Sequence, residues 1–219
     1  RVPADPEVQQ IVEEAYRPHQ ATLNEEIGFT ETMLNRRDYW QSTMGNLVTD
    51  ALRERAGTDV SFFPAWRYGA TILPGKILAE DVYNVVPTDG KIVTYSMNGK
   101  VLKELVENIL QGVSGKDPYA RVGGDMIRFS GMKLDCNLRA KAGSKIRSMM
   151  IGGQPMDEEK EYSIASVHTR FQNNPMFGAT NIKETNKIFV EELIEYVREK
   201  SPLNVQLDNR INLKTIQFN

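Results

Sequence analysis

The chain has 219 residues, with 27 Lys and Arg against 29 Asp and Glu, 40% hydrophobic residues, one Cys and two His. This length gives one large domain or two small ones with a real core, and the near-neutral charge disfavours nucleic acid as a partner. No apolar stretch approaches the roughly 20 residues that span a bilayer. One Cys and two His cannot form an internal disulfide or a zinc site of the usual Cys/His type.

The pattern from Asp5 to about Glu26 predicts a helix with only a thin apolar stripe, which includes Val8, Ile11 and Val12. Such a helix lies across a domain surface or connects to a preceding domain. Pro18 is expected to interrupt it. A strand is expected next, over residues 28–34.

A clearer amphipathic helix follows, with Ser42 or Thr43 as its cap and Gly57 at its end. Its apolar residues recur at i, i+3, i+4, i+7 and i+8, as Met44, Leu47, Val48, Ala51 and Leu52. A buried strand is predicted at 59–63, and a short helix at 79–84.

The second half predicts further alternation of strands and helices. A strand at 91–97 leads through the Asn98-Gly99 turn into a strongly amphipathic helix that ends near Gly112. Later elements are expected as strands at 126–135, 145–151 and 162–167, a loop at 168–179, a helix at 184–200 and two short strands within 204–217. Hairpin-like pairs lie between the helices, so the fold class is expected to be α+β (mixed α/β), with mixed sheets covered by helices in layers.

Few residues are candidates for chemistry, because the chain has no G-x-S-x-G elbow, H-E-x-x-H pair, Walker loop or G-x-G-x-x-G. No catalytic residue is therefore assigned. Trp66, Arg67 and Tyr68 directly follow a predicted buried strand, where the arginine is suited to bidentate capture of an anion between aromatic walls. Equally, the aromatics could anchor the loop while Arg67 pairs with an internal carboxylate.

Other single residues have an ordinary structural interpretation beside a functional one. His168 opens a loop after a strand, where it either faces a ligand or is a partly buried structural histidine. Gly123-Gly124 more often makes a tight turn than a ligand contact. Cys136 near a strand end is more often a small core residue than a reactive thiol, and His19 is expected to be exposed.

Several short motifs occur in a specific order: GNLVTDAL at 45–52, DVS at 59–61, LPGKI at 73–77, DVYNVVP at 81–87, MNGKVLK at 97–103 and YSIA at 162–165. Together they resemble the C-terminal domain of the 5′-nucleotidase family of two-domain metallophosphoesterases. The resemblance implies that residues 1–27 are the interdomain linker helix. Residues 28–219 would be the C-terminal, substrate-recognition domain.

One branch of that family is more similar than the others. FPAWRYGATILPG at 63–75, DPY at 117–119 and GGDMIR at 123–128 resemble segments of the thiosulfohydrolase of the bacterial sulfur-oxidising (Sox) system. Typical 5′-nucleotidases carry a base-stacking aromatic residue where this chain has Thr88. The loop at 169–179 does not follow the thiosulfohydrolase branch closely.

The resemblance implies a two-metal hydrolase whose divalent ions, expected to be Mn, and whose catalytic histidine lie in a preceding N-terminal domain. No cofactor is then expected in this chain, and the partner is its own N-terminal metallophosphoesterase domain. Arg67, Trp66, Tyr68 and His168 would bind an anionic substrate, either free or on a carrier protein. The family resemblance also implies a periplasmic or secreted location, with no nucleic-acid or membrane partner.

Two alternatives stay open. The first is a 5′-nucleotidase or UDP-sugar hydrolase domain that binds a nucleotide, which Thr88 disfavours. The second is a stand-alone binding module without catalysis. The missing metal ligands favour the stand-alone module. The position of the first residue inside an expected linker helix disfavours it.

Overall fold

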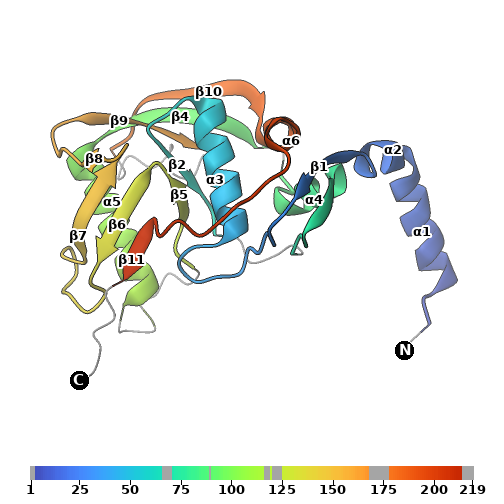
Figure 1. Cartoon of the computed structure of the whole chain (residues 1–219), viewed down its shortest axis with the longest axis horizontal. Helices are drawn as coiled ribbons and strands as arrows, with labels where there is room; N and C mark the ends of the chain where they lie inside the picture. Colours follow the sequence, from blue (N-terminus) through green and yellow to red (C-terminus); the bar gives the residue numbers. More distant parts are fainter. Residues whose placement is uncertain are drawn as a thin grey trace.

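The computed structural model describes residues 3–65, 71–88, 90–115, 119, 125–167 and 178–213 (Figure 1). The helices in these ranges are α1 (Pro6–Tyr16), the 3-10 turn η1 (Arg17–His19), α2 (Gln20–Leu23), α3 (Thr43–Ala56), α4 (Ala79–Val85), α5 (Gly99–Ser114) and α6 (Phe189–Lys200). The strands are β1 (Glu26–Thr30), β2 (Val60–Phe63), β3 (Gly75–Leu78), β4 (Lys91–Asn98), β5 (Arg128–Ser130), β6 (Met132–Cys136), β7 (Ile146–Ile151), β8 (Gln154–Pro155), β9 (Glu161–Ser166), β10 (Thr180–Ile188) and β11 (Ile211–Leu213).

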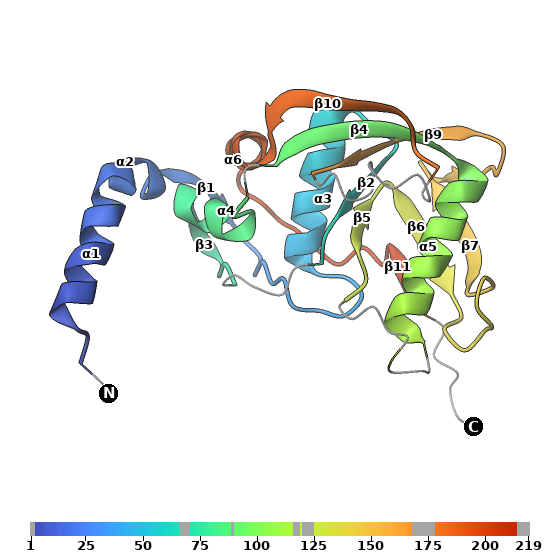
Figure 2. The same cartoon turned by 180° about the vertical axis from the view of Figure 1, so that it is seen from behind.

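The strands form a central five-stranded sheet of order β10-β4-β9-β2-β5, a four-stranded sheet of order β11-β6-β7-β8, and the pair β1-β3. Helices α3 and α6 cover one face of the central sheet, and α5 lies on the other face with the four-stranded sheet (Figures 1 and 2). The expected α+β class, with mixed sheets covered by helices in layers, is confirmed.

Alternate residues of β2 supply two separate cores. Phe63 packs with α3, α4 and α6, whereas Val60 and Phe62 pack with α5 and the four-stranded sheet. All four residues of β2 are buried, as expected for a central strand that is covered on both faces. The central sheet therefore holds both cores together.

Helix α3 has the ends that its sequence predicts. Ser42 Oγ accepts a hydrogen bond from the Gly45 amide at 3.1 Å, and Gly57 ends the helix in the left-handed conformation with φ +65°. These caps fix where the chain enters and leaves the helix. The strand that follows, β2, is thereby placed to run back along α3.

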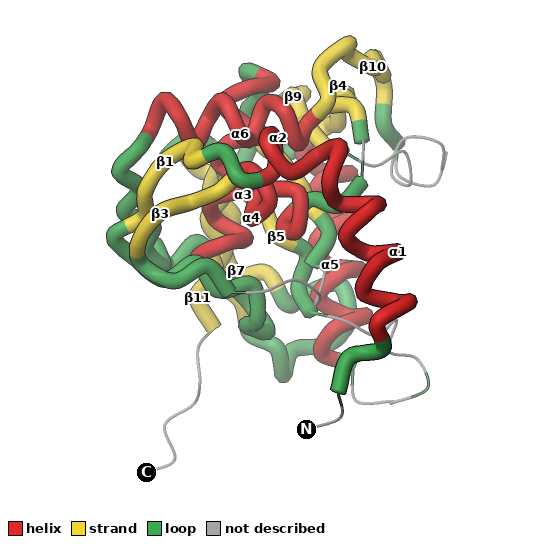
Figure 3. Tube along the Cα trace, turned by 90° about the vertical axis from the view of Figure 1, so that its right-hand side faces the viewer, coloured by secondary structure: helices red, strands yellow, loops and turns green. Residues whose placement is uncertain are grey.

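Helix α1 extends away from the rest of the chain (Figures 1 and 2) and has no buried residue. Ile11 and Val12 on its apolar stripe are each 60% exposed. Pro18 lies in the 3-10 turn that separates α1 from α2, as predicted. Next to α2, β1 and β3 run side by side near α4 and α6 (Figure 3). The role of residues 1–27 as an interdomain linker stays a prediction.

The single strand predicted at 126–135 is wrong, because the chain turns at Gly131 with φ +84°. A Cβ on Gly131 would lie 2.0 Å from the Asp59 carbonyl oxygen, so only glycine fits this close approach. The turn sends β5 into the central sheet and β6 into the four-stranded sheet. One glycine thus moves the chain from one sheet to the other.

The last helix begins at Phe189 rather than at Glu184 as predicted. Residues 180–188 instead form β10, which pairs with β4 at the edge of the central sheet. Most of these residues are exposed, so hydrogen bonding to β4 decides their conformation rather than apolar periodicity. Of the two strands predicted in the tail, β11 is seen among the described residues.

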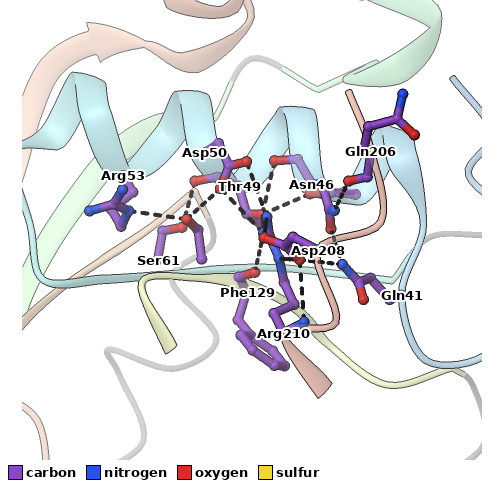
Figure 4. A network of polar contacts seen from close by, with 12 residues as sticks. Gln41, Asn46, Thr49, Asp50, Arg53, Ser61, Phe129, Gln206, Asp208 and Arg210 are labelled. Carbon is purple, nitrogen blue, oxygen red and sulfur yellow. Dashed lines mark hydrogen bonds and ion pairs between the residues drawn. The ribbon is translucent and has the colours of Figure 1, made fainter. Parts of the chain in front are cut away.

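Arg210 fastens the C-terminal segment to α3 (Figure 4). Its Nη2 lies 3.1 Å from Oδ2 of Asp50 and 2.8 Å from Oδ2 of Asp208. Its Nη1 also donates to the Phe129 carbonyl at 2.8 Å and to Thr49 Oγ1 at 3.2 Å. Every guanidinium nitrogen has a partner, because Nε donates to Asp208 Oδ1 at 2.9 Å.

We expect Arg210→Gln to lower the free energy of unfolding at pH 7 by roughly 2–3 kcal/mol, because it leaves two carboxylates without their cation. Burial raises the pKa of Asp208, but the hydrogen bond and charge of Arg210 outweigh it and hold that pKa below its usual value. The stabilisation by this pair is therefore present above the ordinary Asp pKa of about 3.9 and is lost as the pH falls through the lower folded value.

Urea unfolding of wild type and Arg210→Gln between neutral and acid pH measures the loss in the free energy of unfolding and its dependence on pH. The difference between the two proteins should shrink below about pH 4. Arg147→Gln, at an exposed position on β7, is the matched control and should leave stability unchanged. Equal stability of Arg210→Gln and wild type at pH 7 would contradict the structural role of Arg210.

Candidate functional site

One edge of the central sheet gathers several connections of the chain. Strands β2 and β9 are parallel, with Val60 opposite Ile164, so both end at this edge. Strands β4 and β5 are antiparallel to them and begin there. We call this the loop edge, and it is flanked by residues 64–65, 86–88, 125–127 and 167.

The predicted binding residues follow strands that end at the loop edge. Trp66, Arg67 and Tyr68 come after β2, and His168 comes after β9. All four lie outside the described residues, so their roles stay predictions. The Gly123-Gly124 pair also lies outside them.

Arg128, which the sequence argument did not single out, is the first residue of β5 and lies opposite Phe63 at the loop edge. It is only 5% exposed. Its Nη2 donates to the Asp38 carbonyl and lies 3.8 Å from the Asp125 carboxylate. Its Nε and Nη1 have no hydrogen-bond partner. Burial lowers the pKa of Arg128, and the charges of Asp125 and Asp38 oppose that shift.

Arg36 is a second buried cation at this edge and is 8% exposed. Its Nη2 donates to the Val85 carbonyl, which lies at the end of α4. Arg36 and Arg128 both border a small cavity beside Pro64 and Ala65. The sequence shows only an Arg-Arg pair before α3, and nothing in that pattern indicates that one of the two is buried.

An aromatic pair lies beside the entry to β5. The rings of Tyr39 and Trp40 meet edge to face, with their centroids 4.9 Å apart. The Tyr39 carbonyl accepts from the Met126 amide at 2.9 Å, and its hydroxyl donates to the Val113 carbonyl at 2.8 Å. Tyr39 is 42% exposed, so it gives this side of the loop edge an open aromatic surface.

The remaining candidates have structural surroundings. His19 is exposed, as predicted. Burial, with smaller contributions from the carboxylates of Asp135 and Glu107, raises the pKa of the Cys136 thiol to about 12. Cys136 is 0% exposed, which agrees with the interpretation as a small core residue rather than a reactive thiol.

The family model for the C-terminal domain of 5′-nucleotidases matches residues 20–180. The chain belongs to this family. This 5′-nucleotidase C-terminal domain is 26% identical over 200 residues to protein UshA of Escherichia coli K12, a match that covers 85% of this chain and 33% of UshA. It thus spans about a third of the length of that relative.

Solved structures show the same fold. The sulfate thiohydrolase SoxB of Thermus thermophilus has a TM-score of 0.85 and 26% identity to this domain, over 100% of this chain and 40% of that chain. A 5′-nucleotidase precursor, also from Thermus thermophilus, has a TM-score of 0.78 at 22% identity, over 97% of this chain and 44% of that chain. The latter likeness shows the fold alone.

We expect Cys136 to resist alkylation in the folded domain at pH 8, because the thiolate would have to form in a buried, carboxylate-flanked position. Labelling with iodoacetamide, followed by mass spectrometry, should give modification only after denaturation. Ser148→Cys, at an exposed position on β7, is the control and should react in the folded state. Fast labelling of native Cys136 would return it to the candidate reactive residues.

Proposed function

We propose that this chain is the substrate-recognition domain of a two-metal hydrolase of the 5′-nucleotidase family, with thiosulfohydrolase-like specificity. Residues 1–27 would be the interdomain linker helix and residues 28–219 the recognition domain. The two divalent ions, expected to be Mn, and the catalytic histidine would belong to an N-terminal metallophosphoesterase domain. The parent protein would be periplasmic or secreted.

The observation that carries the proposal is the arrangement of the loop edge. Strands β2 and β9 end there and β5 begins there, so three segments that the sequence argument selected are attached to one side of the sheet. Arg36 and Arg128 place two buried positive charges beside them. A surface of this kind favours an anionic group, and Arg67, Trp66, Tyr68 and His168 would complete it.

The described residues of this domain do not fit the implied metal site. In the part of the chain that the structure describes, no group of three or more His, Cys, Asp or Glu side chains is placed to hold a metal ion. We therefore assign this domain a binding role and derive no chemical step through a metal. None of its described helices has the length and apolar character that a membrane span needs.

Specificity for a sulfur-bonded anion is supported by the FPAWRYGATILPG, DPY and GGDMIR segments and by the likeness to SoxB at 26% identity. The second candidate is nucleotide recognition, which is favoured by membership of the 5′-nucleotidase family. Thr88, where a base-stacking aromatic would be expected, argues against it. The third candidate is a binding module without catalytic activity.

The isolated chain should show no metal-stimulated phosphatase activity above background, because its described residues supply no metal site. The full-length parent, assayed with Mn²⁺, should cleave a sulfonate bonded to a peptide cysteine sulfur faster than AMP or UDP-glucose. Turnover by the isolated chain that survives repurification would contradict the binding role. Preference of the parent for AMP or UDP-glucose would instead support the nucleotide alternative.

In the full-length parent, Arg67→Ala should lower kcat/KM roughly 30- to 160-fold if the guanidinium meets a desolvated anion. This factor corresponds to a loss of about 2–3 kcal/mol in transition-state stabilisation. Steady-state kinetics with the preferred substrate measures this loss. Arg147→Ala removes an exposed arginine from β7 and should leave kcat/KM unchanged. Unchanged kinetics for Arg67→Ala would return Arg67 to a structural role.

A further inference from the structure

Helix α1 is attached to the domain through an interrupted joint. Pro18 lies in η1, the 3-10 turn between α1 and α2, and has no amide hydrogen to donate to an earlier carbonyl. Sharp changes in helix direction usually occur at such a proline. Beyond this turn α1 projects away from the body of the domain (Figures 1 and 2). Fewer backbone hydrogen bonds therefore hold the direction of α1 than in a continuous helix.

Tyr16 is the last residue of α1 and differs from the rest of that helix. It is partly buried, whereas every other residue of α1 is exposed. Among the described residues, its side chain is also the one side chain of α1 that hydrogen-bonds beyond the helix. The remaining side-chain bonds of α1 join Gln9 to Glu13 and Gln10 to Glu14 and stay within it.

The Tyr16 hydroxyl lies beside two acceptors from different elements. It is 3.0 Å from Oδ1 of Asn24, the residue that follows α2, and 3.4 Å from Oε2 of Glu80 in the first turn of α4. The shorter contact spans the 3-10 turn, and the longer one reaches the body of the domain. The chain after α2 is itself attached to α4, because the Ala79 amide donates to the Glu25 carbonyl at 2.9 Å. Both acceptors thus belong to segments that are joined to the domain.

We propose that these two contacts, which we call the Tyr16 clasp, set the direction in which α1 projects from the domain. The hydroxyl donates to Asn24 and, at longer range, to Glu80, and so holds α1 across the joint that Pro18 interrupts. One net hydrogen bond shifts an equilibrium by roughly 2- to 10-fold. Helix α1 therefore keeps a preferred direction and can leave it without unfolding the domain, because none of its residues is buried.

In the proposed hydrolase, residues 1–27 connect this domain to a preceding one. The Tyr16 clasp would then also hold the preceding domain in a preferred position relative to the loop edge, a consequence that rests on the proposed function. The clasp itself involves only residues of this chain, so it can be tested without the preceding domain.

Double electron–electron resonance on the 219-residue chain measures the direction of α1. Spin labels are attached at Glu7→Cys on α1 and Glu191→Cys on α6, both at exposed positions, whereas the native Cys136 is 0% exposed and is not expected to take a label. The wild-type distance distribution should have one narrow main peak. Tyr16→Phe should raise the population outside that peak roughly 2- to 10-fold. Tyr83→Phe removes a hydroxyl from a partly buried position on α4 and is the matched control, which should leave the distribution unchanged.

Removal of the acceptors separates the clasp from a loss of folding. The double variant Asn24→Ala and Glu80→Ala keeps Tyr16 and should broaden the distribution as Tyr16→Phe does. The Tm of Tyr16→Phe should stay close to that of wild type, because α1 has no buried residue. A wild-type distribution as broad as that of Tyr16→Phe, or equal broadening by Tyr83→Phe, would overturn the clasp and leave the proposed function untouched. Turnover by the isolated chain would contradict the proposed function and leave these distance measurements unaffected.

Discussion

The parallel pairing of β2 with β9 is the constraint on which the rest of the domain depends. The two strands lie about a hundred residues apart, at 60–63 and 161–166, yet they are neighbours at the centre of the sheet. Parallel neighbours must end at the same edge, and their antiparallel partners β4 and β5 must begin there. This single pairing therefore places the connections after β2 and β9 beside the entry to β5, and it separates the loop edge from the opposite edge.

Two of the buried arginines, Arg210 and Arg128, differ in how fully their side chains are hydrogen-bonded. Arg210 has a partner for every guanidinium nitrogen and ties the C-terminal segment to α3, which is a structural arrangement. Arg128 is equally buried but keeps two nitrogens unpaired at the loop edge. A buried donor without a partner costs free energy, so the side chain of Arg128 is less fully satisfied than that of Arg210.

Family membership accounts for the scaffold more fully than for the specificity. A TM-score of 0.85 at 26% identity means that the layers persist while most side chains change. One fold can host different substrates when the connections between its strands differ. Thr88, which the family resemblance marks as a departure from typical 5′-nucleotidases, lies in the connection between α4 and β4.

The sequence by itself determined the features that depend on neighbouring residues. The caps of α3, the interruption at Pro18, the amphipathic helices and the order of family motifs all follow from local geometry or composition. Only the tertiary structure decided the break at Gly131, the strand character of residues 180–188 and the burial of Arg36 and Arg128. The close approach of the Asp59 carbonyl leaves no room for a Cβ at Gly131, and β10 forms because β4 offers it hydrogen bonds. Arg36 and Arg128 are buried because elements distant in sequence close around them, and no short window of sequence contains those partners.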